Sequence, residues 1–274
     1  MKKAYANRSL LVGVMLLGLS ACGGGEEIAS SILPALLDNN GGNSGNVAPP
    51  DSNRSNSGDN NKGSNTTNSG VVTGVALTTS HNGATSPTRH LLRGKGYDAL
   101  MMDGHVFPLV YPNMNSGNFN EINTTSAHSV VSGNWLRYSR FGTYSDKNTG
   151  LDYSFYVGHP TPTADMPKNG TLSYSGLATM SVNNGDTQKG DSSFRVDFDR
   201  KTIEGSVRVS GPDVVLRGNL NGNTFSGVHE GATMEGAFYG PQADELGGLY
   251  YGTRARYLGL TSDDVHGSFG ATRH

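Results

Sequence analysis

The sequence reads MEGAFYGP at residues 234–241, followed closely by ELGG at residues 245–248, and these two segments are the strongest indication of the fold. The alternation of apolar and polar residues in the first segment is typical of a β-strand, and it stops at Gly240 and Pro241. Proline cannot donate to a strand ladder and fixes its own φ, so it ends the strand. The pair of glycines in the second segment allows the next strand to begin with a tight bend. Two consecutive strands joined by a short turn are therefore predicted.

The same rhythm extends in both directions from this point. Asn-Gly and Glu-Gly pairs and other turn signals separate eight short alternating runs, at residues 171–182, 193–199, 202–209, 214–220, 224–228, 233–238, 247–251 and 266–271. Their even spacing, and the 39 glycines of the chain, favour a mainly β fold with an eight-stranded antiparallel up-and-down barrel over residues 168–274. With eight strands, side chains fill the interior.

A smaller, sheet-containing handle domain is predicted before the barrel, over residues 71–162. The sequence YDALMMDGHVFPLVY at residues 97–111 holds two apolar runs separated by Asp-Gly, a strong signal for a two-residue hairpin. Residues 135–144 and 151–157 read as strands, and the polar segment 112–129 reads as an irregular loop.

The N-terminus predicts export and lipid anchoring. Residues 1–21 combine lysines, a short apolar run and small residues before Cys22, as a cleaved signal peptide does. The sequence around Cys22 resembles the lipobox of bacterial lipoproteins, which makes this residue the expected lipidation site. Residues 22–70 are rich in Asn, Gly and Ser, so they are expected to form a disordered tether that holds the domains away from the membrane. A single cysteine excludes a disulfide framework.

The composition and motifs argue against two classes of function. The net charge is −2 with both signs mixed along the chain, so the basic patch that nucleic-acid binding needs is missing. The sequence contains neither Gly-x-Ser-x-Gly nor the His-x-x-x-His and Cys-x-x-Cys spacings of zinc sites. We therefore expect a binding protein, without a metal site or a resident cofactor, rather than an enzyme.

The barrel region resembles a known family in an ordered series of fragments: SFRVDF at 193–198, KTIEG at 201–205, NTFSG at 223–227, and the two segments at 234–241 and 245–248. Together they are similar to the C-terminal barrel of transferrin-binding protein B, neisserial heparin-binding antigen and factor H-binding protein. Hemophilins are similar in pairing such a barrel with a smaller N-terminal domain. The motif residues are expected to build the scaffold rather than the ligand site: Gly236, Phe238, Tyr239, Gly240 and Pro241.

This resemblance implies a lipoprotein exposed on the outer-membrane surface and exported by the surface lipoprotein assembly modulator. It also implies a host-derived ligand, which is haem or an iron-carrying or haem-carrying host protein taken up for nutrition. The alternative is the recruitment of a complement regulator or a glycosaminoglycan for immune evasion. A fold shared by such different binders does not select among them.

The candidate ligand site lies in the handle domain. His105 follows the hairpin turn beside apolar and aromatic residues, as a haem ligand would. His128 is the second candidate ligand, and Phe107, Tyr111 and Trp135 would supply apolar surface to a porphyrin. The competing interpretation makes His105 a half-buried strand residue and His128 a solvated loop residue.

The aromatic residues between Trp135 and Tyr144, with arginines among them, allow two interpretations. Trp, Tyr and Arg dominate interface hot spots, so this stretch is a candidate protein-binding face. Alternatively, alternate residues of the stretch pack the core of the handle.

Overall fold

A computed structural model describes residues 71–80, 87–94, 96, 99–102, 105–109, 117–182, 186–209, 211–253 and 264–274. All of them belong to one compact unit, residues 64–274. The predicted signal peptide, Cys22 and the whole of the predicted tether, residues 22–70, lie outside the described residues. None of the helical segments described is long and apolar enough to cross a bilayer.

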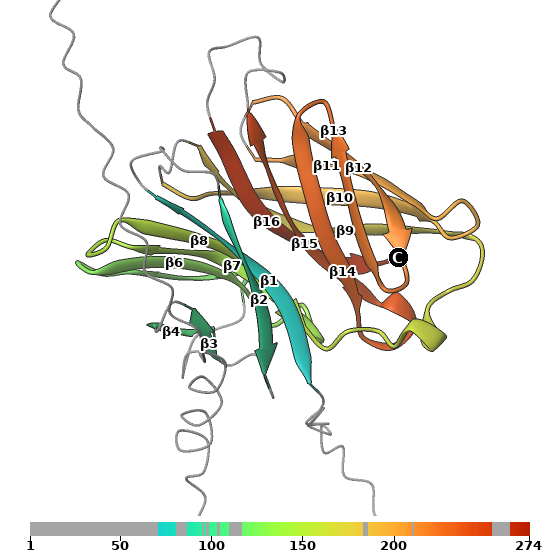
Figure 1. Cartoon of the computed structure of the whole chain (residues 1–274), viewed down its shortest axis with the longest axis horizontal. Helices are drawn as coiled ribbons and strands as arrows, with labels where there is room; N and C mark the ends of the chain where they lie inside the picture. The colour runs from blue at the N-terminus through green and yellow to red at the C-terminus, as the bar shows by residue number, and fades with distance from the viewer. Residues whose placement is uncertain are drawn as a thin grey trace, which may run out of the picture. The chain divides into compact units, whose positions relative to one another are not determined.

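Eight antiparallel strands form a closed barrel in the C-terminal half, which confirms the prediction from the alternating runs. Each strand pairs with the next along the chain, and the last closes onto the first through pairs such as Ala271 with Gly176. Figure 1 shows these strands in yellow to red. They are β9 (Thr171–Val182), β10 (Gln188–Asp197), β11 (Thr202–Arg208), β12 (Val214–Asn221), β13 (Thr224–His229), β14 (Ala232–Tyr239), β15 (Glu245–Thr253) and β16 (Asp264–Arg273).

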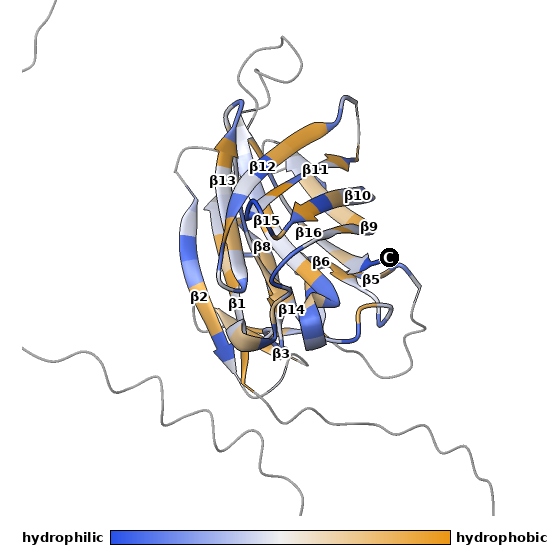
Figure 2. Ribbon diagram, turned by 90° about the vertical axis from the view of Figure 1, so that its right-hand side faces the viewer, coloured by the Kyte–Doolittle hydropathy of each residue, from blue (hydrophilic) through white to orange (hydrophobic). Residues whose placement is uncertain are grey.

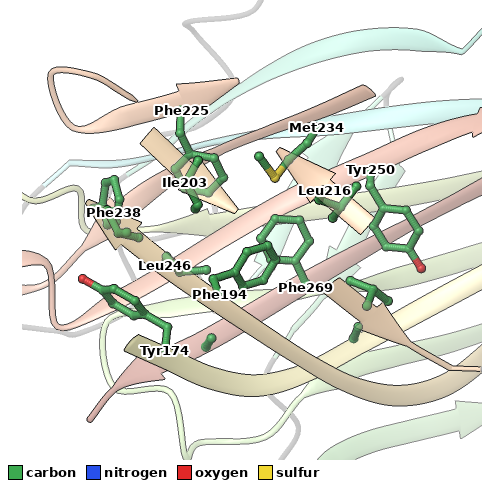
Figure 3. Close-up of a cluster of buried hydrophobic side chains, with 14 of the residues drawn as sticks. Tyr174, Phe194, Ile203, Leu216, Phe225, Met234, Phe238, Leu246, Tyr250 and Phe269 are labelled. Carbon is green, nitrogen blue, oxygen red and sulfur yellow. The ribbon is translucent and has the colours of Figure 1, made fainter. Parts of the chain in front are cut away.

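The inside of the barrel is a packed apolar core. Figure 3 shows aromatic rings from facing strands meeting at its centre, where the ring centroids of Phe194 and Phe269 lie 4.6 Å apart. Phe225 and Phe238 are likewise buried there, with centroids 5.4 Å apart. Burying one such ring contributes roughly 1.5–3 kcal/mol. The alternation read from the sequence therefore reflects an interior filled by side chains, as expected for eight strands.

The handle consists of a six-stranded antiparallel sheet and a separate two-stranded hairpin. The strand order in the sheet is β2-β1-β8-β7-β6-β5, so β2 and β5 form its edges. The strands of the handle are β1 (Val72–Ser80), β2 (Thr88–Gly94), β5 (Phe119–Asn123), β6 (Ala127–Ser132), β7 (Ser139–Asp146) and β8 (Leu151–Gly158), with the hairpin strands β3 (Ala99–Met102) and β4 (His105–Pro108).

The predicted hairpin is confirmed, because Met102 pairs directly with His105 across a two-residue connection. Two details of the handle prediction are wrong. The segment expected as an irregular loop, 112–129, contains the whole of β5 and the start of β6. The strand expected from residue 135 begins only at Ser139. The sequence-based division between handle and barrel falls in the connection from β8 to β9, which holds the short 3₁₀ turn η2 (Thr163–Asp165).

The two faces of the six-stranded sheet bury different sets of residues. One face, here called the outer face, carries Val131, Tyr153 and Phe155 and is covered by the β3–β4 hairpin. The inner face carries Phe141 and Tyr156 and packs with barrel residues in a second cluster. Figure 2 shows how hydrophobic and hydrophilic residues alternate along the strands that supply these faces. The handle sheet is therefore buried on both sides.

Candidate functional site

The β3–β4 hairpin has one buried and one exposed surface. Leu100 and Phe107 are paired and buried, and the ring of Phe107 lies 4.2 Å from that of Tyr144 on the outer face. The neighbouring pair, Met101 and Val106, points the other way because successive side chains of a strand alternate. These two residues are 44% and 55% exposed. The hairpin thus presents two adjacent apolar side chains to solvent.

Two predicted site residues can be placed only in part or not at all. His105 begins β4 opposite Met102, and its side chain lies outside the described part of the structure. Tyr111 lies outside the described residues altogether. Their roles as a haem ligand and as apolar lining therefore stay predictions.

His128 lies on β6 and takes part in a chain of charged contacts. Its Nε2 atom lies 2.8 Å from Oε1 of Glu121 on β5, and the other carboxylate oxygen accepts from Nζ of Lys189 on β10. The hydrogen bond from Lys189 and then that from His128 lower the pKa of Glu121. His128 is therefore a half-buried strand residue that holds a carboxylate, rather than the solvated loop residue of the competing interpretation.

Phe107 and His128 lie on opposite faces of the sheet. His128 pairs with Ser145, and paired residues of antiparallel strands share a face. Phe107 packs against Tyr144, the neighbour of Ser145, whose side chain points to the other face. A ligand in contact with one of these side chains cannot reach the other without passing through the sheet.

Trp135 also lies apart from Phe107. Its Nε1 donates to the carbonyl oxygen of Asn118 at 3.0 Å, and its ring packs edge-on against Phe141 on the inner face. The structure therefore does not bring Phe107, His128 and Trp135 into one pocket.

The aromatic stretch from Trp135 serves mainly as core, as the second interpretation predicted. Phe141 is fully buried, and Arg140 is buried with its guanidinium donating to the carbonyl oxygens of Leu136 and Ser139. Tyr144 is half-buried and packs against the hairpin. Phe141 cannot be part of a protein-binding face, because a side chain without exposed surface cannot contact a partner.

A buried carboxylate joins the handle to the barrel. Glu245 begins β15, is 3% exposed, and accepts hydrogen bonds from the backbone N–H of Arg137 and Tyr138 and from Oγ of Ser139 at 2.7 Å. Burial raises the pKa of this carboxyl, and the donors oppose that rise. The motif at residues 245–248 indicated only a turn, so nothing local in the sequence predicted that Glu245 bonds residues more than a hundred positions away.

A buried histidine makes a second connection that sequence reasoning missed. His266 on β16 is 4% exposed, with Nδ1 2.9 Å from Oγ of Ser154 and Nε2 3.4 Å from Oγ1 of Thr79, both on the handle. Burial lowers the pKa of His266 to about 4, so the ring is neutral at physiological pH. It bridges two hydroxyls rather than binding a ligand.

The residues of the barrel motif, at positions 236–241, contribute to packing within the protein. Phe238 and Tyr239 are fully buried. Gly240 has a φ of 74°, and a Cβ there would lie 2.3 Å from the ring of Tyr138 on the handle. A Cβ at Gly236 would lie 2.2 Å from the ring of Phe225. Pro241 then begins the short turn η3 (Pro241–Ala243).

The described residues offer no cluster of three or more His, Cys, Asp or Glu side chains that could hold a metal ion. Three open hollows of about 470, 580 and 530 Å³ lie over barrel strands, lined largely by Ser, Gly, Arg and acidic residues. Neither Phe107 nor His128 lines any of these three hollows. The Met101–Val106 surface of the hairpin is therefore the candidate site that the described geometry favours.

Comparison with known proteins shows which family the barrel resembles. Residues 166–273 match the family described as the C-lobe and N-lobe β-barrels of transferrin-binding protein B. An uncharacterized protein of Haemophilus influenzae is 34% identical over 178 residues, which cover 56% of this chain and 60% of that protein. Transferrin-binding protein B of H. influenzae is 27% identical over 205 residues, covering 56% of this chain and 32% of its own length. The similarity thus spans 60% of the length of the first relative and about a third of the second.

Solved structures show the same fold beyond the barrel. Transferrin-binding protein B of serogroup B Neisseria meningitidis matches with a TM-score of 0.57 and 23% identity over 74% of this chain and 43% of that one. The protein of Haemophilus parasuis matches with a TM-score of 0.56 and 22% identity over 74% of this chain and 45% of that one. Because 74% of the chain exceeds the barrel alone, the match includes handle strands. The chain therefore carries a β-barrel that is similar to those of transferrin-binding protein B, preceded by a handle sheet.

Proposed function

We propose that this chain is a surface-exposed lipoprotein of the outer membrane that binds an iron-carrying host protein. The observation that carries the proposal is the family match over residues 166–273. It is supported by relatives named transferrin-binding protein B, with which the similarity spans 55–56% of this chain. The matched family consists of binding proteins, and a catalytic role is not part of the proposal.

The contact surface would be the exposed side of the β3–β4 hairpin. Met101 and Val106 are adjacent and exposed, while Leu100 and Phe107 hold the hairpin against the outer face. A pre-formed apolar pair on a packed support loses little entropy when a partner covers it. Methionine also adapts its shape to different surfaces. The hairpin is thus suited to a protein partner.

The same geometry favours a protein over free haem. Phe107 is 1% exposed and His128 lies on the opposite face in contact with Glu121, so these two side chains cannot both reach one porphyrin. The predicted haem site is then reduced to coordination of the iron by His105 alone. We propose a protein as the ligand because a protein surface can cover the exposed Met101–Val106 pair without an enclosed cavity.

Anchoring and export complete the proposal. The lipobox-like sequence before Cys22 supports acylation of that residue, and two or three acyl chains anchor a protein durably. A long polar tether would let the handle and barrel reach a large partner. Export to the cell surface would use the surface lipoprotein assembly modulator, as the resemblance of the barrel implies.

The test is surface plasmon resonance of the purified protein with immobilised iron-loaded transferrin. Wild-type protein is expected to bind, and Val106→Asp to bind at least about tenfold more weakly, because a carboxylate replaces roughly 1.4 kcal/mol or more of apolar contact. The matched control is Val228→Asp, which alters an apolar residue that is 72% exposed on β13 of the barrel. Equal loss in both variants would remove the hairpin assignment. Binding of a complement regulator in place of transferrin would remove the proposed function.

A further inference from the structure

One of the three open hollows lies where the handle meets the wall of the barrel. Its volume is about 530 Å³, and the handle contributes Asn118 and Trp135 to its lining while β9, β10, β11 and β16 contribute the rest. The handle packs on the barrel beside it, because a Cβ at Gly270 of β16 would lie 2.5 Å from the ring of Phe141. Small-ligand sites commonly measure about 300–1,000 Å³ and often lie between two parts of a protein. The hollow is therefore large enough for a ligand that contacts both parts.

The barrel wall supplies two neighbouring rows of side chains to this hollow. One row consists of hydroxyl residues that the register places side by side on four neighbouring strands: Thr272, Ser175, Ser193 and Ser206. Tyr174 and Phe194, which adjoin this row along the chain, are buried in the barrel core, so the hydroxyl row points outward. In the next row Leu177 is paired with Asp191. The floor of the hollow thus presents hydroxyls that donate and accept hydrogen bonds, with a carboxylate beside them.

Trp135 offers this hollow its carbon surface rather than its polar atom. Its Nε1 already donates to the carbonyl oxygen of Asn118 at 3.0 Å, and its ring lies edge-on to Phe141 with centroids 6.3 Å apart. Leu177, which also lines the hollow, packs against the same buried cluster as Trp135. A ring fixed by such contacts loses little conformational entropy when a ligand covers it. The hollow is thus apolar at Trp135 and Leu177 and polar along the hydroxyl row.

The charges of the lining favour a neutral ligand over an anion. Arg208 lines the hollow, but its guanidinium is held by Asp213 through hydrogen bonds of 2.7 and 2.8 Å. Asp191 is the other charged residue of this lining, and it is exposed. A carboxylate repels an anionic ligand, whereas it accepts strong hydrogen bonds from neutral hydroxyls.

We propose that this hollow binds a short neutral saccharide. The C–H groups of a sugar ring would cover Trp135 and Leu177, while the sugar hydroxyls would exchange hydrogen bonds with the hydroxyl row and donate to Asp191. Saccharides combine apolar C–H faces with many hydroxyl groups on one small molecule, which is the combination that this lining complements. The hollow shares no lining residue with the Met101–Val106 surface, so the inference does not depend on which protein the hairpin binds.

The first test uses the fluorescence of Trp135, which is the only tryptophan of the chain and therefore reports on this hollow directly. The purified protein is titrated with neutral tetrasaccharides of glucose, galactose, mannose and N-acetylglucosamine, each separately. At least one of them is expected to produce a saturable change in emission. A heparin tetrasaccharide is expected to produce none, because its sulfates would meet Asp191.

Calorimetry with the saccharide that binds then locates the site. Asp191→Ala is expected to weaken binding at least about tenfold, because a hydrogen bond to a charged acceptor is lost. The matched control is Asp186→Ala, which removes an exposed carboxylate just before β10 that lines none of the three hollows, and it should bind like wild type. Trp135→Ala, with its folding checked by thermal unfolding, should show no binding.

Val106→Asp, the hairpin variant, should bind the saccharide like wild type, which separates this inference from the proposed function. Three results would overturn the saccharide site. They are a failure of all the neutral tetrasaccharides to bind, tighter binding of the heparin tetrasaccharide, and equal affinity of Asp191→Ala and Asp186→Ala.

Discussion

At the scale of single residues, the handle and barrel are held together by polar groups that are buried and satisfied. Glu245 accepts from three donors of the handle, and His266 bridges two handle hydroxyls. A buried polar group costs little when it is paired and much when its partner is removed. These two residues are therefore where single substitutions should affect stability most.

Removal of the Glu245 carboxylate should destabilise the protein strongly. Glu245→Ala leaves the N–H groups of Arg137 and Tyr138 and the hydroxyl of Ser139 without their acceptor, so the free energy of unfolding should fall by about 3 kcal/mol or more. The control is Asp244→Ala, which removes a partly exposed ion pair with Arg273 and should cost less than about 1 kcal/mol. Urea unfolding measures both, and equal effects would show that Glu245 has no special role.

The buried His266 predicts acid sensitivity. Its folded pKa of about 4 lies below the value of about 6.5 in an unfolded chain, so the unfolded state binds the proton more readily between these pH values. The contribution of neutral His266 to the free energy of unfolding is therefore fully present above pH 6.5. It decreases by up to about 3 kcal/mol as the pH falls towards 4.

Unfolding of the wild type and of His266→Gln across this pH range isolates that contribution. Burial raises the pKa of Glu245 in the folded state, so the contribution of Glu245 to stability increases, rather than decreases, as the pH falls towards that pKa. This contribution is present in both proteins and cancels in the comparison. The difference in unfolding free energy between the two proteins should shrink as the pH falls from 6.5 to 4. A difference that is independent of pH would contradict the assignment.

At the level of secondary-structure elements, the strands whose own residues alternate between apolar and polar could be predicted from the sequence. The strands whose position depends on contacts with residues far away in the sequence could not. The barrel runs alternate because one side of every strand faces the core, as the buried Phe194 and Val196 of β10 illustrate. The β3–β4 hairpin was predictable because its turn residues are adjacent. The edge strand β5 was missed because its sequence, FNEIN, is polar and only partly buried.

The start of β7 was misplaced for a related reason. The backbone N–H groups of Arg137 and Tyr138 donate hydrogen bonds to Glu245 of the barrel rather than to a neighbouring strand, so the chain is irregular there although its composition suits a strand.

The prediction of the ligand site was limited in the same way. Phe107 and His128 are separated by which face of the sheet each one occupies, and that depends on the register of β4 and β6.

At the scale of the whole molecule, handle and barrel share a core. Val75, Leu136 and Tyr156 of the handle cluster with Tyr239 and Leu249 of the barrel. The barrel motif takes part in this contact, because Gly240 leaves room for the ring of Tyr138. The family motif therefore supports the handle as well as the barrel, and the handle presents the proposed binding hairpin from a rigid base.

Attachment to the membrane is predicted to depend on one residue. Cys22→Ser should move the protein from the membrane fraction to the soluble fraction, since the apolar segment before it is too short to span a bilayer. Ser31→Ala, a nearby change in the predicted tether, should leave the protein membrane-bound. Detergent partitioning of cells producing each variant makes the comparison, and retention of Cys22→Ser in the membrane would refute the lipobox interpretation.

The proposed ligand is an iron-carrying protein rather than free haem. Parallel calorimetric titrations of the wild-type protein with iron-loaded transferrin and with haemin distinguish the two ligands. Saturable binding of transferrin, with no stoichiometric binding of haemin and no shift of its Soret band, is the predicted result. Stoichiometric haemin binding that is lost in His105→Ala, together with no heat from transferrin, would contradict the claim.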